Sequence, residues 1–555
     1  MWGRAKMGDC HPISLVESLC LQKNWKRKSG AAPFFGSSDF RHRLLVVRDG
    51  YPDHQFPAGR TYNINMRPWY QNNGILLLVC LLLPPAGLVV LWFRRDFRVI
   101  RKISFSIGLV TLSVIHLFTF YGLRVEMAGS GAAPIFTFHD PDSHFDEIER
   151  RQQAEPGTVE AASRPFVAGG AYWTDFRGPN RDGHYEESSI NTNWKDGQLP
   201  ELWRQSVGGG YASVVVAEGR VFTIEQRRDR ETVACYDLGS GKELWIHAWE
   251  YLFQESLGGD GPRATPTWHE GKVYALGAGG DLRVLDAETG KLIWEKNILT
   301  DNGAPNLPWA MSASPLIVGE KVLVQPGGPG GRSVVAYHKD TGEPIWRSLD
   351  DKQAYTSPML VTLAGKSQLL IVSAERMMGL SVDDGAFLWD YPWTTPFDAN
   401  IPQPLLVDEN TVFVSAGYGH GSALVKISEN NGVLAAGEVW KNNRMKAKFN
   451  PPVLYEGHVY GLDESILQCI DVQTGKQMWK GGRYGYGQVL LADGHLIIVT
   501  EQGDIVLVKA TPESHQELAR FPAISGKTWN NPAIAGGRLI VRNQTEMACY
   551  DISGT

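Results

Sequence analysis

Residue pairs spaced two apart recur along the chain, and in most of them an aromatic or basic residue is followed by a hydroxyl or amide residue. Examples are "YAS" from Tyr211 to Ser213 and "YGQ" from Tyr486 to Gln488. Aromatic rings can stack on a flat ligand or a peptide, and polar groups beside them can orient it. The candidate binding residues are Tyr211, Arg263, Tyr355, Gln403, Tyr486, Gln488, Trp529 and Asn531. The alternative interpretation is that the aromatic side chains pack between structural units and the polar groups hold buried water.

The sequence offers no convincing catalytic or metal-binding group. Asp260, Asp301 and Asp398 have the setting of solvated loop carboxylates, and "HDPDSH" (139–144) is better explained as a polar linker than as a loose metal site. The six cysteines include no adjacent pair and no C-x-x-C. The glycine-rich "GGPGG" precedes no helix, so it is no phosphate cradle. We therefore predict no catalytic residue, no metal site and no required cofactor.

Composition indicates a folded chain and argues against nucleic acid as a partner. Of the 555 residues, 43% are hydrophobic and 21% are charged, as in folded domains. The formal net charge of -6 provides no broad basic surface for a phosphate backbone. The 60 glycines and 18 tryptophans suit many short strands joined by tight turns.

One phrase is repeated along the chain, and "LDAETGKLIW", from Leu285 to Trp294, is a clear copy. Each clear copy has a glycine where a hairpin turn needs positive φ, and a second hairpin signal precedes it. Each unit is therefore expected to contain four strands, A to D. The aromatic residue that ends strand D is expected to fill the gap to the neighbouring unit. These docking residues are Trp203, Trp245, Trp294, Trp346, Trp389, Trp440 and Trp479, with Phe521 in a degenerate copy.

The repeat predicts an all-β fold, an eight-bladed β-propeller of four-stranded blades. Unit ends are spaced by about 40 to 50 residues, which is typical of propeller blades. The last unit lacks a fourth strand, whereas "PELWRQSV" (200–207) is a lone fourth strand, so their pairing is expected to close the ring. Cys235, Cys469 and Cys549 occupy one repeat position in different blades, and we predict buried free thiols there.

The connections differ between the two faces of such a ring. The A-to-B and C-to-D turns are tight, whereas the B-to-C and D-to-A connections are long and varied, so we expect binding on the second face. Aromatic residues in the D-to-A loops, namely Trp249, Tyr251, Phe253 and Trp393, are expected to be exposed anchors for a partner. The starts of the A strands should form a collar at the centre of that face, composed of Tyr211, Arg263, Ser312, Tyr355, Ile401, Phe449, Tyr486 and Trp529.

From about Trp173 onward, the chain resembles the pyrroloquinoline-quinone-type (PQQ) β-propeller repeat family, and within it the bacterial proteins related to the propeller subunit of the outer-membrane assembly complex. The resemblance rests on the "D-x-x-T-G-K-x-x-W" phrases and on "WTDFRGPNRDG" (173–183). It implies a monomeric scaffold for envelope or membrane proteins, with a quinone-dependent dehydrogenase of alcohols or sugars as the alternative. The family's enzymes hold PQQ beside calcium with a vicinal disulfide and a carboxylate set, and no such set can be matched here.

Two apolar segments precede the repeat. Residues 74–93 and 103–123 are each long enough to cross a bilayer of about 30 Å as a helix. The basic "RRDFRVIRK" between them is expected to stay in the cytoplasm. This predicts a two-helix transmembrane hairpin in the inner (cytoplasmic) membrane, kinked at Pro84, with both ends and the propeller on the periplasmic side.

The remaining segments complete the predicted domain organisation. Residues 1–65 are expected to be a non-native or disordered extension, with Met66 as the natural start, which N-terminal sequencing would test. The hairpin occupies 66–124, a flexible linker 125–172, a segment packed on the propeller 173–199, and the propeller 200–555.

Overall fold

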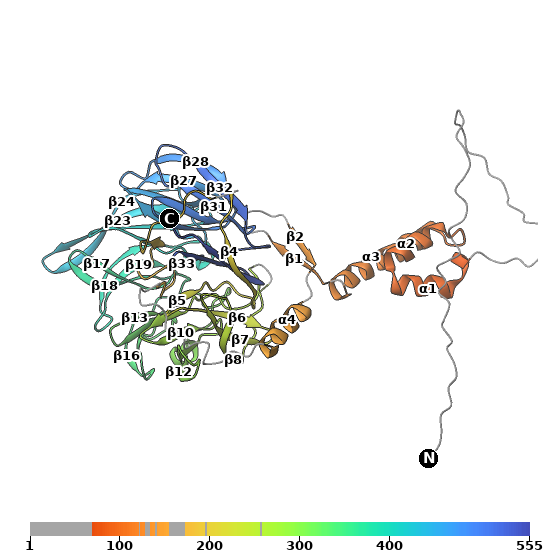
Figure 1. The fold of residues 1–555 in the computed structure, drawn as a ribbon, viewed down its shortest axis with the longest axis horizontal. Helices are drawn as coiled ribbons and strands as arrows, with labels where there is room; N and C mark the ends of the chain where they lie inside the picture. The colour runs from red at the N-terminus through yellow and green to blue at the C-terminus, as the bar shows by residue number, and fades with distance from the viewer. Residues whose placement is uncertain are drawn as a thin grey trace, which may run out of the picture. The chain divides into compact units, whose positions relative to one another are not determined.

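The computed structural model describes residues 69–120, 122–127, 134–138, 141–154, 172–194, 197–255 and 258–554. The predicted extension over residues 1–65 and the proposed start at Met66 lie outside the described residues. The described chain consists of an apolar helical segment, a linker with a short hairpin and one helix, and a ring of antiparallel sheets (Figure 1).

Eight sheets form the propeller, and each contains strands A to D of one blade in order. Blade 1 is β5 (Val215–Ala217), β6 (Arg220–Arg227), β7 (Arg230–Asp237) and β8 (Glu243–Glu250). Blade 2 is β9 (Thr267–His269), β10 (Lys272–Leu276), β11 (Asp281–Asp286) and β12 (Leu292–Asn297). Blade 3 is β13 (Leu316–Val318), β14 (Lys321–Val324), β15 (Val334–His338) and β16 (Pro344–Ser348). Blade 4 is β17 (Met359–Leu363), β18 (Lys366–Val372), β19 (Arg376–Ser381) and β20 (Phe387–Pro392).

The second half of the ring repeats this plan. Blade 5 is β21 (Leu405–Asp408), β22 (Thr411–Ala416), β23 (Gly421–Asn430) and β24 (Val433–Asn442). Blade 6 is β25 (Val453–Tyr455), β26 (His458–Asp463), β27 (Ile466–Asp471) and β28 (Gln477–Arg483). Blade 7 is β29 (Gln488–Ala492), β30 (His495–Val499), β31 (Asp504–Lys509) and β32 (Glu517–Pro522), with β3 (His184–Tyr185) added parallel to β29. Blade 8 is β33 (Ala533–Ala535), β34 (Arg538–Arg542), β35 (Glu546–Asp551) and β4 (Glu201–Ser206).

The ring closes by pairing its earliest outer strand with its last sheet. Strand β4 runs antiparallel to β35, with Trp203 opposite Cys549 and Gln205 opposite Met547. The predicted eight-bladed propeller of four-stranded blades and its closure are therefore confirmed. Cys235, Cys469 and Cys549 are buried and free, as predicted.

The docking tryptophans join consecutive blades in a repeated way. In six of the seven, the indole Nε1 donates a hydrogen bond of 2.8–3.2 Å to a backbone carbonyl of the next blade. In five of these six, the ring also lies against the turn glycine of that blade, so that a Cβ at Gly290 would be 2.5 Å from Trp245. Gly290 has a φ of 71°. The glycine of the phrase is therefore required by the turn and by the neighbouring indole.

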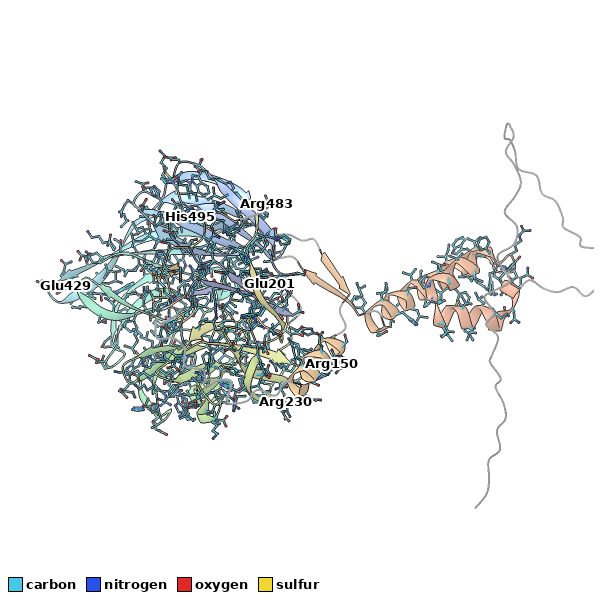
Figure 2. The ribbon with its side chains drawn as sticks, in the orientation of Figure 1. Arg150, Glu201, Arg230, Glu429, Arg483 and His495 are labelled. Atoms are coloured by element: carbon cyan, nitrogen blue, oxygen red, sulfur yellow. The ribbon has the colours of Figure 1, made fainter. Side chains whose placement is uncertain are left out.

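Trp389 is the exception. Its Nε1 donates to Gln368 within the same blade (2.5 Å), and the next blade has a much longer C-to-D hairpin than the other blades. The C and D strands of blade 5, β23 and β24, are each ten residues long and form a hairpin that packs against blade 4, where Tyr391 donates to Glu438 (2.5 Å). Figure 2 shows Glu429 near the far end of this hairpin, away from the other labelled residues.

The apolar segment differs from the predicted pair of spans. The helix α3 (Val99–Phe120) is long and apolar enough to cross a membrane, but residues 74–93 form two short helices, α1 (Asn73–Leu82) and α2 (Pro84–Phe93), which follow the 3-10 turn η1 (Trp69–Gln71). Ten helical residues extend about 15 Å, half of a bilayer core. Proline at position 84 ends the helical hydrogen bonding of α1, and a Cβ at Gly87 would lie 2.7 Å from Cys80, so α1 and α2 fold back on each other.

A buried arginine holds both ends of this helical pair together. Arg94, 2% exposed, follows α2 and donates to Asn73 Oδ1 (2.7 Å) and to the Tyr70 carbonyl (3.3 Å), and it forms an ion pair with Asp96 (2.5 Å). The start of α1 therefore lies beside the basic connection between α2 and α3.

The predicted flexible linker contains regular structure. Besides β1 (Leu123–Met127) and β2 (Pro134–Phe138), it contains α4 (Pro141–Ala154). Asp142, Asp146 and Glu149 lie on one face of α4 and all pair with Arg228, in the β6–β7 connection. Helix α4 was not predicted, because its partner Arg228 lies far away in the sequence.

Glu231 lies buried between blades 1 and 2. Its side chain is fully inaccessible to solvent, and Oε1 accepts a hydrogen bond of 2.8 Å from the Ala278 backbone N–H. Burial raises its pKa to about 8, so this carboxyl is largely protonated at neutral pH.

We expect Gly290→Ala to destabilise the propeller by roughly 1–3 kcal/mol more than Gly271→Ala. Both glycines have a φ near 70°, but a Cβ at Gly271 meets nothing within 4 Å, whereas one at Gly290 meets Trp245. The free energy of unfolding from urea titrations measures the difference. Equal losses would show that the indole contact does not constrain this turn.

We expect Glu231→Gln to change how stability depends on pH. The folded pKa of Glu231 lies above its ordinary value of 4.5, so its contribution to stability is present below pH 4.5 and is lost as pH rises towards 8. Relative to the wild type, the Gln variant should therefore gain thermal stability between pH 5 and pH 9. Parallel pH profiles of the melting temperature would contradict this assignment.

Candidate functional site

The A strands of the propeller place the predicted collar at the centre of the loop face, the face that carries the B-to-C and D-to-A connections. Four of its aromatic residues form a continuous cluster. The ring centroids of Tyr211 and Trp529 are 5.2 Å apart, those of Trp529 and Phe449 are 4.6 Å apart, and those of Phe449 and Tyr486 are 5.4 Å apart. Because Phe449 of blade 6 reaches Trp529 of blade 8, these rings form a platform across the end of blade 7.

Tyr355, also proposed from the sequence, lies apart from this platform. Its ring packs on Trp309, with centroids 5.8 Å apart, and the side chain is buried. Burial raises the pKa of Tyr355 to about 12. The structure therefore brings together Tyr211, Tyr486 and Trp529 but not Tyr355.

Three cations lie over the aromatic platform. Arg263 lies 5.6 Å from the centroid of Tyr211, and Lys527 Nζ lies 4.5 Å from that of Trp529. Lys448 Nζ lies 4.5 Å from the centroid of Tyr486 and 4.8 Å from that of Tyr418. Of these cations, Arg263 was predicted from the sequence, whereas Lys448 and Lys527 were not. Their signal is their place beside collar residues, because Lys448 directly precedes Phe449 and Lys527 lies two residues before Trp529.

The polar residues beneath the collar mainly bond one blade to another. Gln488 Nε2 donates to the carbonyl of Trp529 in blade 8 (2.8 Å), and Gln403 Nε2 donates to that of Ser357 in blade 4 (2.9 Å). Asn531 accepts from Arg177 at 3.4 Å. The two glutamine contacts are between blades, and that of Asn531 is to the segment from Trp173, so the amide groups proposed as ligand-binding groups also stabilise the ring.

The segment from Trp173 closes the centre of the ring on the opposite side. Arg177, 1% exposed, donates to the carbonyls of Pro452 (3.0 Å) and Val489 (3.1 Å), in blades 6 and 7. Arg181, 2% exposed, donates to the carbonyl of Pro358 in blade 4 (3.0 Å) and pairs with Asp175 (2.9 Å). The two guanidinium groups therefore join opposite sides of the ring beneath the polar residues.

The loop aromatics do not follow the prediction. Trp249 and Trp393 are buried rather than exposed, because Arg283 lies over Trp249 (4.5 Å) and His420 packs on Trp393 (4.4 Å). Tyr251 and Phe253 are partly buried. Phe397, which the sequence analysis did not single out, is 72% exposed in the 3-10 turn η3 (Pro396–Asp398).

The loop carboxylates serve structural contacts. Asp301 accepts hydrogen bonds from Tyr337 (2.6 Å) and Arg347 (2.9 Å), and Asp260 accepts from the backbone of Glu255 (3.1 Å). Asp398 lies 3.9 Å from Lys352. These contacts assign no catalytic role to the three carboxylates.

The collar does not fit a calcium-assisted quinone. Among the described residues, the one group of three potential metal ligands is Glu320, His338 and Asp340, which lies in the A-to-B and C-to-D turns of blade 3, on the face opposite the collar. Lys272 already pairs with Asp340 (2.9 Å). At the collar, Glu501 accepts from Trp529 Nε1 (3.0 Å), and Glu464 acts on Tyr486 and Lys448 from a distance. The residues present can stack on a flat group, but they do not supply the carboxylate set that calcium prefers.

Sequence comparison identifies two kinds of relatives. The family model described as outer membrane protein assembly factor BamB matches residues 192–307 and 229–481, slightly more than half of the chain. BamB of Yersinia pestis is 24% identical over 265 residues, which cover 44% of this chain and 63% of that protein, less than two thirds of its length. The quinohemoprotein alcohol dehydrogenase ADH IIB of Pseudomonas putida is 37% identical over 121 residues, which cover 21% of this chain and 17% of the enzyme.

A solved structure supports the same fold. The quinohemoprotein alcohol dehydrogenase of Comamonas testosteroni matches with a TM-score of 0.50 and 13% sequence identity, covering 74% of this chain and 85% of that chain. At this identity the likeness shows the fold alone. The repeat phrases, the closed eight-bladed ring and the family match together show that the chain belongs to the PQQ-repeat β-propeller family described as outer membrane protein assembly factor BamB.

Proposed function

We propose that this protein is a membrane-anchored, extracytoplasmic scaffold that binds other envelope proteins through the loop face of its propeller. The observation that carries the proposal is the collar, where aromatic rings and cations gather on a rigid ring without a matching set of catalytic carboxylates. Relatives named as an assembly factor support a binding role. The blades form one closed frame, which suits a monomeric protein that presents loops to partners.

The proposed location is the inner membrane, with the propeller in the periplasm. Helix α3 would be the span, because Arg94, Arg95, Arg98, Arg101 and Lys102 lie before or at its start and favour the cytoplasm. The competing arrangement is the two-helix hairpin, in which α1 and α2 straighten into a first span. We favour a folded-back α1–α2 pair, because Arg94 bonds Asn73 at the start of α1.

A quinone-dependent dehydrogenase is the second candidate function. It is favoured by the 37% identity to the Pseudomonas putida enzyme over 121 residues. The collar would then stack on the quinone, but calcium would need ligands that the described residues do not gather there.

In the arrangement we favour, the residues before α1 face the cytoplasm, on the same side as the basic connection. A reporter tag placed before Met66 in intact cells should therefore resist external protease after the outer membrane is permeabilised, while the propeller remains accessible. If the tag is cleaved, the two-span hairpin is correct instead. The propeller should be outside in both arrangements.

A photo-crosslinking residue at Leu252, which is 45% exposed in a D-to-A loop, should capture envelope proteins in living cells. The matched control carries the photo-crosslinking residue in place of Glu288, which is exposed in the C-to-D turn of blade 2 on the opposite face. It should capture few envelope proteins. Equal capture from both positions, or none from Leu252, would contradict binding through the loop face.

Adding PQQ and calcium to the purified chain should produce neither bound-cofactor absorbance nor dye reduction with alcohols or sugars. The expectation follows from the missing carboxylate set at the collar. Bound quinone together with substrate turnover would show that the protein is a dehydrogenase and would contradict the scaffold proposal.

A further inference from the structure

Lys448 is a cation held in place between two aromatic rings. Its Nζ lies 4.5 Å from the ring centroid of Tyr486 and 4.8 Å from that of Tyr418. Its backbone packs against Gly417, where a Cβ would lie 2.9 Å from Lys448 Cα. Within the described part of the chain its ammonium group forms no ion pair within 4.0 Å, and burial lowers its pKa. The position is therefore fixed, and the charge has no direct carboxylate partner there.

Lys448 has both carboxylates and cations around it. Glu464 and Glu501 act on it from a distance, without an ion pair. Lys527 and Arg263 extend the same arc over Trp529 and Tyr211. Both also donate to loop carbonyls, Lys527 to Gly258 (2.9 Å) and Arg263 to Gly259 (2.5 Å). Glu501, the carboxylate against the platform, accepts a hydrogen bond from Trp529 Nε1 at 3.0 Å. A ligand carboxylate at Lys448 would supply the direct ion pair that neither Glu464 nor Glu501 forms, since a cation over aromatic rings retains much of its attraction for a carboxylate.

An exposed apolar anchor lies at the end of the same arc. The ring centroid of Phe397 is 6.1 Å from that of Tyr418, and Phe397 is 72% exposed. Its φ is 66° and that of Asp398 is 55°, a left-handed conformation that costs of order 1–3 kcal/mol for each such residue. The fold therefore maintains an exposed phenylalanine in a strained turn beside Lys448.

We propose that the arc Phe397–Tyr418–Lys448–Tyr486 binds an acidic peptide segment of a partner protein. A carboxylate of the peptide meets the Lys448 ammonium, and a neighbouring apolar side chain packs on Phe397. This proposal rests on the scaffold function and names the chemistry of its partner. A peptide fits this site better than a membrane surface does. Anionic lipids are recognised by clusters of exposed cations, whereas here each cation lies separately over aromatic rings.

The test is a selection from a random peptide display library on the purified full chain in lipid nanodiscs. The enriched peptides should carry Asp or Glu near an aromatic or aliphatic residue. A fluorescein-labelled copy of the most enriched peptide should bind Lys448→Met at least tenfold more weakly by anisotropy, and Phe397→Ala should also weaken it. Changing the acidic residues of the peptide to Asn or Gln should have a similar effect on the wild type.

Lys441→Met is the matched control, because Lys441 also lies over an aromatic ring, at 5.0 Å from the centroid of Trp393, but outside the collar. It removes the same charge and should leave the affinity unchanged. Selection without acidic enrichment, full affinity in Lys448→Met, or equal loss in Lys441→Met would overturn the proposal. Binding to phosphatidylglycerol vesicles that depends on Lys448, without peptide binding, would assign the site to lipid instead.

The scaffold and the peptide site can fail separately. If crosslinking from Leu252 fails but acidic peptides bind through Lys448, the scaffold is wrong and the peptide site stands. If crosslinking succeeds while Lys448→Met keeps full peptide affinity, the peptide site alone is wrong.

Discussion

A four-stranded blade has two apolar faces and cannot cover either without a neighbour. The indole at the end of most outer strands solves this problem, because it donates to a carbonyl of the next blade and lies against that blade's turn glycine. The hydrogen bond and the glycine contact together fix both the position and the orientation of one blade relative to the next. At the junction of blades 4 and 5, Trp389 bonds within its own blade and the long hairpin of blade 5 covers the junction instead.

At the centre of the ring, polar side chains join the inner strands. Gln488 and Gln403 bond to carbonyls of adjacent blades, and Arg177 and Arg181 join opposite sides from below. A buried amide that already bonds two blades cannot turn towards a ligand without leaving a polar group unpaired, which costs about 1–3 kcal/mol. The ligand proposed for this face would therefore contact the aromatic platform and its cations.

This division explains how the family's fold can accommodate different functions. The rigid part is built from repeat positions, whereas the loop face varies without disturbing the blades. In this chain the variation has produced cations seated on aromatic rings and an exposed phenylalanine in a strained turn. Carboxylates on the same face are engaged in local contacts, as Asp301 is with Tyr337 and Arg347.

The sequence by itself determined the number of blades, the closure by residues 200–207 and the buried thiols, because each depends on spacing or repeat position. It also placed Tyr211, Tyr486 and Trp529 at one level of the ring. Only the tertiary structure decided that Tyr355 stands apart, that Trp249 and Trp393 are buried, and that Lys448 and Phe397 join the collar. It also revealed α4 and the fold-back at Pro84. These features depend on contacts between residues far apart in the chain, such as Arg228 with α4 and Arg283 with Trp249, which no local pattern records.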